Sequence, residues 1–352
     1  MTLISICIPA YNRAELLSEL LDSVLTQDFP DYEIVISEDN SPQRPEIRAI
    51  ASRYSQHHKG IIRYFENSIN YGYDANIRKL IELANGDYVL FMGNDDLLAP
   101  NALRLIAEAV HNYPSIGVVL RSYASFIDAP SRPVQIFRYF NEDRFFPSGT
   151  ESAITFFRRC VFISGLVIKR SSALAYASDR FDGTLLYQQY LVGNILKRES
   201  GVYLNCILSY HRLGGVPDFG VSAAEQGRFV PKRQTPESSL HFVRGMLEIA
   251  FSLNDSNSMN IGTKILHDIG NYAYPILSIQ AGGSRATFTG YTWKLLMLGF
   301  WQVPLFYIYV FGLLILGRTK CDFLIQQIKT MLGRAPQLGK VYSGTSRVKY
   351  KG

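Results

Sequence analysis

The chain has 352 residues, of which 47% are hydrophobic, and its 36 basic and 30 acidic side chains give a formal net charge of +6. This length and apolar content are enough for a substantial buried core. The four cysteines are widely separated and form no Cys-x-x-Cys pair, which argues against a zinc site or a disulfide framework. No Gly-x-Gly-x-x-Gly or Gly-Lys-Ser/Thr signature occurs, which argues against a dinucleotide oxidoreductase or a P-loop enzyme.

The first hundred residues alternate between apolar runs rich in β-branched residues and stretches with apolar residues at helical spacing. The pattern predicts strands at 3–8, 33–37, 61–65 and 87–92, and helices at 14–27, 45–55 and 74–84. Such alternation is typical of an α/β fold with a mainly parallel sheet and helices on both faces.

Acidic residues follow two of these predicted strands at the point where each strand ends. Asp95 and Asp96 come after the strand at 87–92, and Asp39 comes after the strand at 33–37. Because ligands of open α/β sheets bind beyond the carboxyl ends of the strands, these carboxylates are candidates for holding a hard divalent ion. The alternative is local, since Asn and Asp are common turn formers and Asp96 would then cap the next helix.

Five short motifs occur in a characteristic order in the N-terminal part. They lie at 8–13 (Ile-Pro-Ala-Tyr-Asn-Arg), 37–41 (Ser-Glu-Asp-Asn-Ser), 70–72 (Asn-Tyr-Gly) with Asn76, 84–88 (Ala-Asn-Gly-Asp-Tyr) and 94–96 (Asn-Asp-Asp). In these motifs the chain resembles the family 2 glycosyltransferases, strongly over residues 1–125 and more weakly to about residue 215. The motifs are most similar to those of bacterial enzymes of O-antigen and capsular polysaccharide synthesis, including abequosyltransferases.

The resemblance implies a GT-A fold, a nucleotide-diphosphate-sugar donor and a divalent ion, Mn²⁺ or Mg²⁺. The ion would stabilise the negative charge that builds on the departing diphosphate. Matched onto the family motif, Asp95 is the direct metal ligand, and Asn94 stands where many members carry an aspartate. Whether Asp95 holds the ion alone or together with Asp96 is left open. His211 is either a further metal ligand, a diphosphate contact or an ordinary satisfied histidine.

By the same resemblance, Asp39 hydrogen-bonds the base of the nucleotide, and the loop at 9–13 lies beside the base and ribose. A carboxylate only accepts hydrogen bonds, so Asp39 would read an imide or amino N–H group. The alternatives are a local turn for Asp39 and a solvated surface charge for Arg13. The donor-binding candidates are Pro9, Ala10, Tyr11, Asn12, Arg13, Asp39, Asn70, Gly72, Asn76 and Asn94.

The predicted acceptor half departs from the family pattern. Inverting members carry a general base, usually an aspartate, in a stretch that corresponds to residues 181–190, but this chain has Gln188 and Gln189 there. Glutamine cannot accept a proton. The base is then Asp182 or Asp179, the nearest carboxylates in sequence, or the reaction does not follow the usual inverting course. The Gly214–Gly215 pair predicts a loop that closes over the donor.

The C-terminal third has a different pattern, with predicted helices at 237–253 and 261–280 and an apolar segment at 295–317 that is long enough to cross a bilayer. We therefore expect three parts: a GT-A catalytic domain, a helical region and a membrane-associating end. Their predicted ranges are 1–230 (nucleotide-sugar half 1–125, acceptor half 126–230), 231–290 and 291–352.

The positive charge of the chain is concentrated in its last residues. Residues 318–352 hold eight basic and one acidic residue, whereas residues 1–317 carry a net charge of −1. We expect this tail to approach anionic lipid at the cytoplasmic membrane surface. An in-plane or re-entrant helix bent at Pro304 is favoured over a simple span, and a buried oligomer-forming helix is the alternative. Nucleic acid is a weaker partner, because the tail has few aromatic residues.

Two functional hypotheses follow. The first is a glycosyltransferase at the cytoplasmic face of the bacterial inner membrane, which moves a sugar from a nucleotide-diphosphate donor to a polyprenyl-diphosphate-linked glycan in O-antigen synthesis. The second is a non-catalytic relative that binds nucleotide sugar or glycan in a membrane assembly. Gln188 and Gln189 at the expected base position keep the second hypothesis open.

Overall fold

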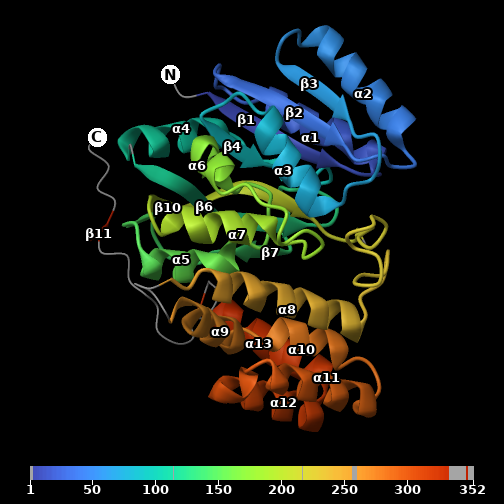
Figure 1. Cartoon of the computed structure of the whole chain (residues 1–352), viewed down its shortest axis with the longest axis vertical. Coiled ribbons are helices and arrows are strands. Elements are labelled where there is room, and N and C mark those ends of the chain that lie inside the picture. Colours follow the sequence, from blue (N-terminus) through green and yellow to red (C-terminus); the bar gives the residue numbers. More distant parts are fainter. Residues whose placement is uncertain (1–2, 114, 216, 256–259, 333–345, 348–352) are drawn as a thin grey trace.

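A computed structural model gives the structure of the protein and describes residues 3–113, 115–215, 217–255, 260–332 and 346–347 (Figure 1). A large mixed sheet is covered by helices on both faces, and a group of helices from the C-terminal third lies at one end of the long axis. The predicted tail at 318–352 is therefore described as far as residue 332 and at 346–347 only.

Three of the strands that bear on the site, β4, β1 and β2, are parallel neighbours in the sheet, and the fourth, β10, lies in a second parallel group. The strand order is β11-β8-β10-β6-β9-β4-β1-β2-β3, with β1 parallel to β2 and β4, β2 parallel to β3, and β10 parallel to β6. The antiparallel β9 joins the two parallel groups by pairing with both β4 and β6. The bounds of the strands are β1 Ile4–Ala10, β2 Tyr32–Glu38, β3 Ile62–Glu66, β4 Tyr88–Phe91, β5 Leu97–Leu98, β6 Ile116–Phe126, β7 Gln135–Phe137, β8 Arg144–Phe146, β9 Val167–Lys169, β10 Ser200–Arg212 and β11 Ser346–Arg347.

Helices cover the sheet because side chains alternate between its two faces. In β1, Ile6 and Ile8 pack into the core under α1, α2 and α4, whereas Cys7 packs into the core under α3, α5 and α7. The expected α/β architecture with a mainly parallel sheet is confirmed. The helices of this part are α1 Ala14–Leu25, α2 Arg44–His57, α3 Tyr73–Leu83, α4 Ala102–Asn112, α5 Thr150–Phe157, the 3₁₀ turn η1 Arg158–Cys160, α6 Arg170–Ala175 and α7 Tyr187–Leu196.

The C-terminal helices build a third core of their own, which also takes in Phe157 and Leu186 from the sheet domain. The prediction of a single helix at 261–280 is wrong. α9 ends before Tyr272, and a new helix begins after Ala273 with Pro275 in its first turn. The elements are α8 Pro236–Ser252, α9 Ile261–Asn271, α10 Tyr274–Gln280, α11 Arg285–Met297, the 3₁₀ turn η2 Phe300–Gln302, α12 Pro304–Leu316 and α13 Arg318–Leu332.

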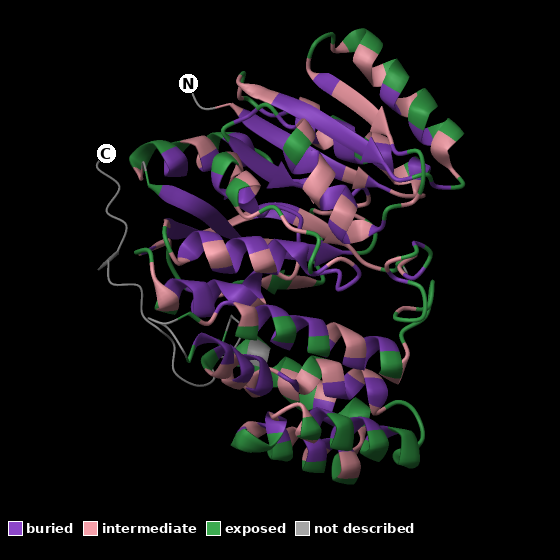
Figure 2. Cartoon of the chain, in the orientation of Figure 1, coloured by how far each residue is buried: buried purple, intermediate pink, exposed green. Residues whose placement is uncertain are grey.

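The apolar segment at 295–317 is not one continuous helix. α11 ends at Met297, η2 follows, and α12 begins at Pro304, whose missing N–H is tolerated in the first helical turn. Among the described residues, no helix combines the length and the apolar character that crossing a bilayer requires. Figure 2 shows that exposed and buried residues alternate along these helices.

Candidate active site

Four loop or strand ends meet at the carboxyl edge of the central strands. They are the loop that follows β1 at residues 11–13, Asp39 after β2, residues 92–96 after β4, and the last residues of β10. Asn12, Arg13 and Asn40 have positive φ angles, which turn the chain sharply out of the sheet at this edge. Most of the predicted donor and metal residues are therefore brought to one place.

The adjacent carboxylates of Asp95 and Asp96 have different surroundings. Asp96 is buried, and it accepts hydrogen bonds from Ser164 Oγ at 2.5 Å and the Arg212 backbone N–H at 3.0 Å, with His211 Nδ1 at 3.1 Å. Asp95 is partly exposed and forms an ion pair with Arg13. Asp96 is thus fixed by its neighbours, whereas Asp95 has a long, flexible partner that another cation could replace.

The electrostatics of this cluster favour a cation. Burial, followed by the negative charge of Asp96, raises the pKa of Asp95 above its ordinary value, and Arg13 opposes that rise. Burial lowers the pKa of His211, but the hydrogen bond and charge of Asp96 outweigh burial, so that the net shift is upward. The charge of Asp96 contributes to both upward shifts, whereas burial raises the pKa of Asp95 and lowers that of His211.

The described residues contain no group of three or more His, Cys, Asp or Glu side chains arranged to hold a metal ion. The donors that are present, Asp95 with His211 beside Asp96, nevertheless fit a hard divalent ion of the Mg²⁺ type. Such an ion needs only one or two carboxylates from the protein and takes its other ligands from phosphate oxygens and water.

Asn94 ties the β4 loop to the β1 loop. Its side-chain Nδ2 donates to the backbone carbonyl of Asn12 at 2.8 Å. Asn12 Nδ2 in turn donates to Asp218 Oδ2 at 3.0 Å, and Asn12 Oδ1 is buried without a hydrogen-bond partner. An unpartnered buried carbonyl oxygen is costly, so Asn12 Oδ1 is available to accept from a ligand.

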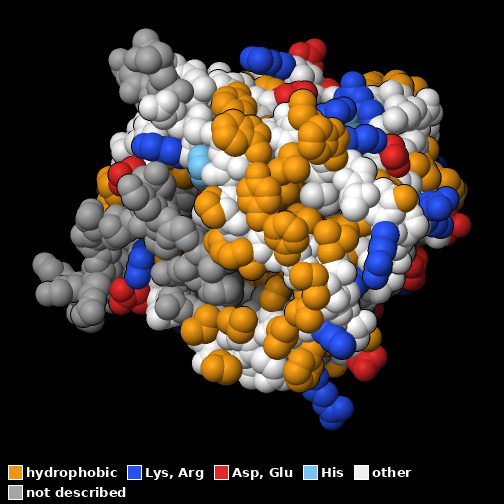
Figure 3. All heavy atoms as spheres, turned by 90° about the horizontal axis from the view of Figure 1, so that it is seen from below, with side chains coloured by type: hydrophobic (Ala, Val, Ile, Leu, Met, Phe, Trp, Pro, Cys, Tyr) orange, Lys and Arg blue, Asp and Glu red, His pale blue; other side chains and the backbone are white. Residues whose placement is uncertain are grey.

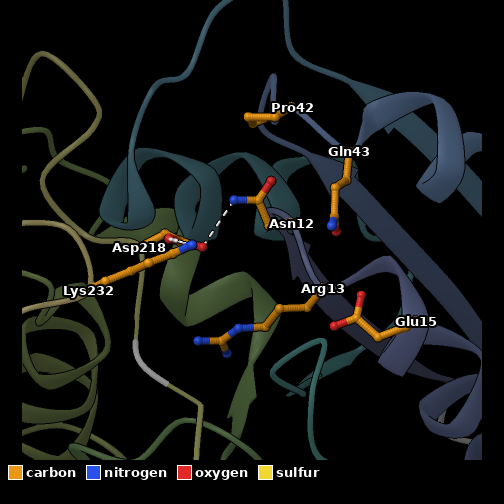
Figure 4. A pocket seen from close by; sticks show the side chains of 7 residues that line it. All are labelled: Asn12, Arg13, Glu15, Pro42, Gln43, Asp218 and Lys232. Carbon is orange, nitrogen blue, oxygen red and sulfur yellow. Dashed lines mark hydrogen bonds and ion pairs between the residues drawn. The ribbon is translucent and has the colours of Figure 1, made fainter.

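A pocket of about 580 Å³ opens beside this loop (Figure 4). Asp218 and Lys232, which come from the segment after β10, close one side of it and face Asn12. The full lining is Asn12, Arg13, Glu15, Pro42, Gln43, Asp218 and Lys232. The nearby Gly214–Gly215 pair was predicted from the sequence, whereas Asp218 and Lys232 were not. A carboxylate shortly after the glycine pair was the available signal for Asp218, and Lys232 had none.

Asp39 is buried and organises the chain between residues 67 and 72. Its Oδ1 accepts from Asn67 Nδ2 at 2.7 Å and from the Tyr71 backbone N–H at 3.0 Å, and its Oδ2 accepts from the Gly72 backbone N–H at 2.9 Å. Burial raises the pKa of Asp39, although these hydrogen bonds oppose the rise. Oδ2 makes one of these contacts and retains the capacity to accept another donor, such as a base N–H.

The other predicted donor residues lie in the loop at 70–72, at the end of β1, or, for Asn76, in the core. Asn70 Oδ1 accepts from the Gly72 backbone N–H at 2.9 Å, and a side chain at Gly72 is disfavoured by its φ of 89° and by Ser222 Oγ, 2.5 Å from an added Cβ. Asn76 is buried and donates to the Ser37 carbonyl at 3.1 Å, which is a structural contact. Pro9 and Ala10 end β1, and the Ala10 carbonyl accepts from the Asp39 N–H at 3.0 Å.

The residues considered for the general base are engaged by partners outside this cluster or are exposed. Both carboxylate oxygens of Asp182 accept from Arg78, at 2.7 and 2.8 Å, and Asp179 is exposed. Gln189 is buried, with Nε2 donating to the Phe157 carbonyl at 2.8 Å. Among the hydrogen bonds of the described residues, none connects Asp179, Asp182 or Gln189 to Asp95 or Asp96.

Two buried carboxylates that were not predicted from the sequence, Asp74 and Glu225, hold segments against the start of α3. Asp74 accepts from the backbone N–H groups of Gly183, Leu185 and Tyr187 at 2.8–2.9 Å. Glu225 accepts from the Tyr73 N–H at 2.9 Å and the Gly220 N–H at 2.8 Å. These contacts attach the predicted acceptor segment and the loop after β10 to the predicted donor half.

The fold, with acidic residues at the carboxyl ends of its parallel strands, is that of the GT-A class. Residues 5–167 match the model of Glycosyl transferase family 2, and this part of the chain is a family 2 glycosyltransferase domain. Among solved structures, residues 1–349 of S. aureus TarS align with a TM-score of 0.57 and 19% identity, over 78% of this chain and 72% of that chain. A Pyrobaculum calidifontis mannosyltransferase in complex with GDP-Man and Mn²⁺ aligns with a TM-score of 0.51 and 14% identity, over 90% and 87% of the two chains.

Curated relatives match the N-terminal part. The abequosyltransferase RfbV of Salmonella typhimurium is 41% identical over 30% of this chain and 31% of its own. A Campylobacter jejuni GalNAc(5)-diNAcBac-PP-undecaprenol beta-1,3-glucosyltransferase is 28% identical over 31% of this chain and 34% of its own. The matched stretch thus spans about a third of the length of these relatives.

Proposed function

We propose that the protein is a glycosyltransferase that moves a sugar from a nucleotide-diphosphate donor to a saccharide acceptor. The observation that carries this proposal is the Asp95 carboxylate next to the pocket lined by Asn12 and Arg13, at the carboxyl edge of parallel strands in a family 2 domain. Two neighbours of the same fold were solved with UDP-GlcNAc and with GDP-Man, and these support a nucleotide-sugar donor.

The donor would lie between Asp39 and Asp95. Asp39 would accept a base N–H, the unpartnered Asn12 Oδ1 would accept from the ribose or base, and Arg13 would move from Asp95 to the diphosphate. A divalent ion, Mg²⁺ or Mn²⁺, held by Asp95 and His211 would supply Lewis-acid stabilisation of the leaving diphosphate. The neighbour with bound Mn²⁺ supports such a metal dependence.

The acceptor is proposed to be a glycan on a polyprenyl diphosphate at the cytoplasmic face of the bacterial inner membrane. Support comes from the Campylobacter relative, whose name specifies an undecaprenol-linked acceptor. The similarity to an abequosyltransferase agrees with the resemblance of the sequence motifs to those of enzymes of O-antigen synthesis. Asp182 and Asp179 remain the proposed general bases, although the ion pair of Asp182 with Arg78 favours a positioning role for Asp182.

The test is transfer by the full chain with a panel of nucleotide sugars, with and without Mn²⁺, and with a lipid-linked saccharide as acceptor. We expect metal-dependent turnover that Asp95→Asn lowers by a factor on the order of 10³, since electrostatic stabilisation of the leaving group contributes about several kcal/mol. Asp28→Asn, in the exposed loop at the opposite edge of the sheet, is the matched control and should leave turnover unchanged.

Calorimetric titration with nucleoside diphosphate separates the enzyme from a non-catalytic binder. Tight, Mn²⁺-dependent binding without turnover of any donor would support the binder and contradict the proposed activity. Full activity of Asp95→Asn would contradict the proposed role of Asp95 as a metal ligand.

A further inference from the structure

The helix α12 is apolar on two opposite sides, but only one of them is covered. Phe306, Val310 and Leu313 are buried in the core of the C-terminal helices. Ile308, Phe311 and Ile315 form the opposite stripe, and their exposed fractions are 63%, 58% and 77%. A helix that is apolar all round is normally buried all round, so the exposed stripe lacks its expected partner among the described residues.

The exposed stripe belongs to a larger apolar surface, which we call the basal face. It consists of the exposed hydrophobic residues of α11, η2, α12 and α13: Trp293, Met297, Trp301, Tyr307, Ile308, Phe311, Ile315, Leu316, Phe323, Leu324, Ile328, Met331 and Leu332. Figure 3, which views the molecule from this end, shows hydrophobic side chains running across the surface with Lys and Arg at its edge. The face includes both tryptophans of the chain.

Charge on these elements is almost entirely positive. Residues 273–332 contain five basic residues and a single acid, Asp322, which accepts from Tyr274 and Ser278 and forms an exposed ion pair with Arg318. The described basic side chains are exposed: Arg285, Lys294, Arg318 and Lys320. An apolar surface with tryptophans and a basic rim matches the layered chemistry of an anionic bilayer surface, which is apolar inside and negative at the headgroups.

We propose that the basal face docks in the plane of an anionic lipid bilayer. α12 has 13 residues and is therefore about 20 Å long, shorter than the roughly 30 Å hydrocarbon core, so it lies along the surface and does not cross it. Ile308, Phe311 and Ile315 enter the upper acyl region, Trp293 and Trp301 lie at the headgroup level, and Lys294 and Lys320 meet lipid phosphates. The proposal places a membrane site on the helices but does not depend on the transfer reaction.

Vesicle binding tests the proposal on the full chain without any substrate. Because both tryptophans lie on the basal face, intrinsic tryptophan fluorescence reports this face alone. We expect emission to shift to shorter wavelength with vesicles that contain anionic phosphatidylglycerol, and cosedimentation at least tenfold stronger than with neutral phosphatidylcholine vesicles. Brominated acyl chains should quench the emission.

The decisive variant is Phe311→Ser combined with Ile315→Ser. Both side chains are exposed, so the fold and its melting temperature should be preserved, whereas partitioning into vesicles should fall about tenfold or more, in line with the loss of two buried apolar side chains. Ile127→Ser, an equally exposed residue of the sheet domain, is the matched control and should bind like the unaltered protein.

Three results would overturn the proposal. Blue-shifted emission that grows with protein concentration in the absence of lipid, together with a dimer in sedimentation velocity, would make a second copy the occupant. A chain truncated after residue 332 that shows red-shifted emission relative to the full chain would make the last twenty residues the occupant. Vesicle binding that salt abolishes and that the double variant does not weaken would be electrostatic attachment without use of this face.

Discussion

Arg13 is the residue that most clearly links the structure to the proposed chemistry. It is held in a left-handed conformation with a φ of 59°, and its guanidinium pairs with Asp95. An ideal Cβ built on Gly215 would lie 3.6 Å from Arg13 Nη2 and 3.7 Å from Asp95 Oδ2, so the loop after β10 passes directly over this pair. Arg13 therefore neutralises the carboxylate that is proposed to hold a metal ion.

This competition predicts the effect of removing the guanidinium. Arg13→Gln should bind Mn²⁺ about fivefold more tightly than the unaltered protein when no nucleotide is present, because a partly exposed ion pair contributes about 1 kcal/mol. Electron paramagnetic resonance of free Mn²⁺ measures the binding directly. Arg48→Gln, which removes an exposed ion pair with Glu66 on α2 and β3, serves as the control, and an unchanged affinity in Arg13→Gln would contradict the competition.

The pair of Arg78 with Asp182 decides between two roles for Asp182. Both oxygens of the carboxylate are engaged by the guanidinium, which also donates to the Ser178 carbonyl at 2.9 Å. We expect Asp182→Asn to lower the free energy of unfolding by about 1–3 kcal/mol, because Arg78 then lacks its counter-charge, while turnover falls less than about tenfold. Urea unfolding and steady-state kinetics measure the two effects. Turnover that drops about a thousandfold while stability is unchanged would restore Asp182 as the base.

At the scale of elements, the start of α3 is where the two halves of the sheet domain are joined. Asp74 in its first turn accepts three backbone N–H groups of the segment 183–187, and Glu225 holds Tyr73 N–H from the loop after β10. Helix N-termini stabilise negative charge, but Asp74 is wholly buried and has Asp182 and Glu225 nearby. Burial is the larger effect and raises the pKa of Asp74 from 3.8 to about 7.

This shift predicts a pH dependence of stability with a definite sign. A carboxyl whose pKa is higher in the folded than in the unfolded chain stabilises the fold while it is protonated, and this contribution is lost as pH rises from about 4 to about 7. Between about pH 5 and 7 we expect the unaltered protein to lose about 2 kcal/mol of unfolding free energy that Asp74→Asn does not lose. Asp74→Asn is expected to be less stable at the acidic end of this range, because its amide cannot accept from all three N–H groups.

Urea unfolding of both proteins across this pH range measures the difference in slope. Asp28→Asn, an exposed aspartate, should retain the slope of the unaltered protein. Identical slopes for Asp74→Asn and the unaltered protein would show that Asp74 is ionised throughout.

The elements of the N-terminal half of the sheet domain could be predicted from the sequence because local patterns determine them. The expected strand at 87–92 is β4 Tyr88–Phe91, and the expected helix at 74–84 is α3 Tyr73–Leu83. The prediction of one helix at 261–280 was wrong because the periodic spacing of apolar residues continues through Tyr272 and Ala273. The helix nevertheless ends there, and the next helix has Pro275 in its first turn.

The site could be predicted in part for the same reason. The position of Asp95 and Asp96 directly after a strand is a local feature, and both lie at the strand end as expected. The pairing of Asp95 with Arg13 joins residues 82 positions apart, and that of Asp182 with Arg78 joins residues 104 apart. Nothing in the spacing of a single sequence encodes such contacts, because they depend on how distant elements pack.

On the scale of the whole molecule, the C-terminal helices are not an independent appendage. Their core includes Phe157 of α5 and Leu186 just before α7, and Arg158 forms an ion pair with Asp268 of α9. Four side chains from α11 to α12 are fully buried in this core: Leu295, Phe300, Val303 and Phe306. A shared core of this kind unfolds together with the domain it covers.

This packing predicts how two truncations differ. Deletion of residues 290–352 removes those four buried side chains, and a single large-to-small change in a core already costs about 2–5 kcal/mol, which is a large part of a typical unfolding free energy. We therefore expect this shortened chain to be recovered as aggregated or partly unfolded protein. Deletion of residues 333–352 removes only the two-residue strand β11 from the described structure, and it should leave the melting temperature nearly unchanged.

Thermal unfolding and near-ultraviolet circular dichroism distinguish the outcomes. A pair of substitutions within α12 supplies the matched control: Phe306→Ala should destabilise the protein by about 3–5 kcal/mol, whereas Phe311→Ala, on the exposed side of the same helix, should have little effect. If the chain ending at residue 289 folds with the melting temperature of the full chain, the helices do not share a cooperative core with the sheet. Loss of membrane binding after that deletion would then be evidence about the basal face, whereas in an unfolded protein it would not be.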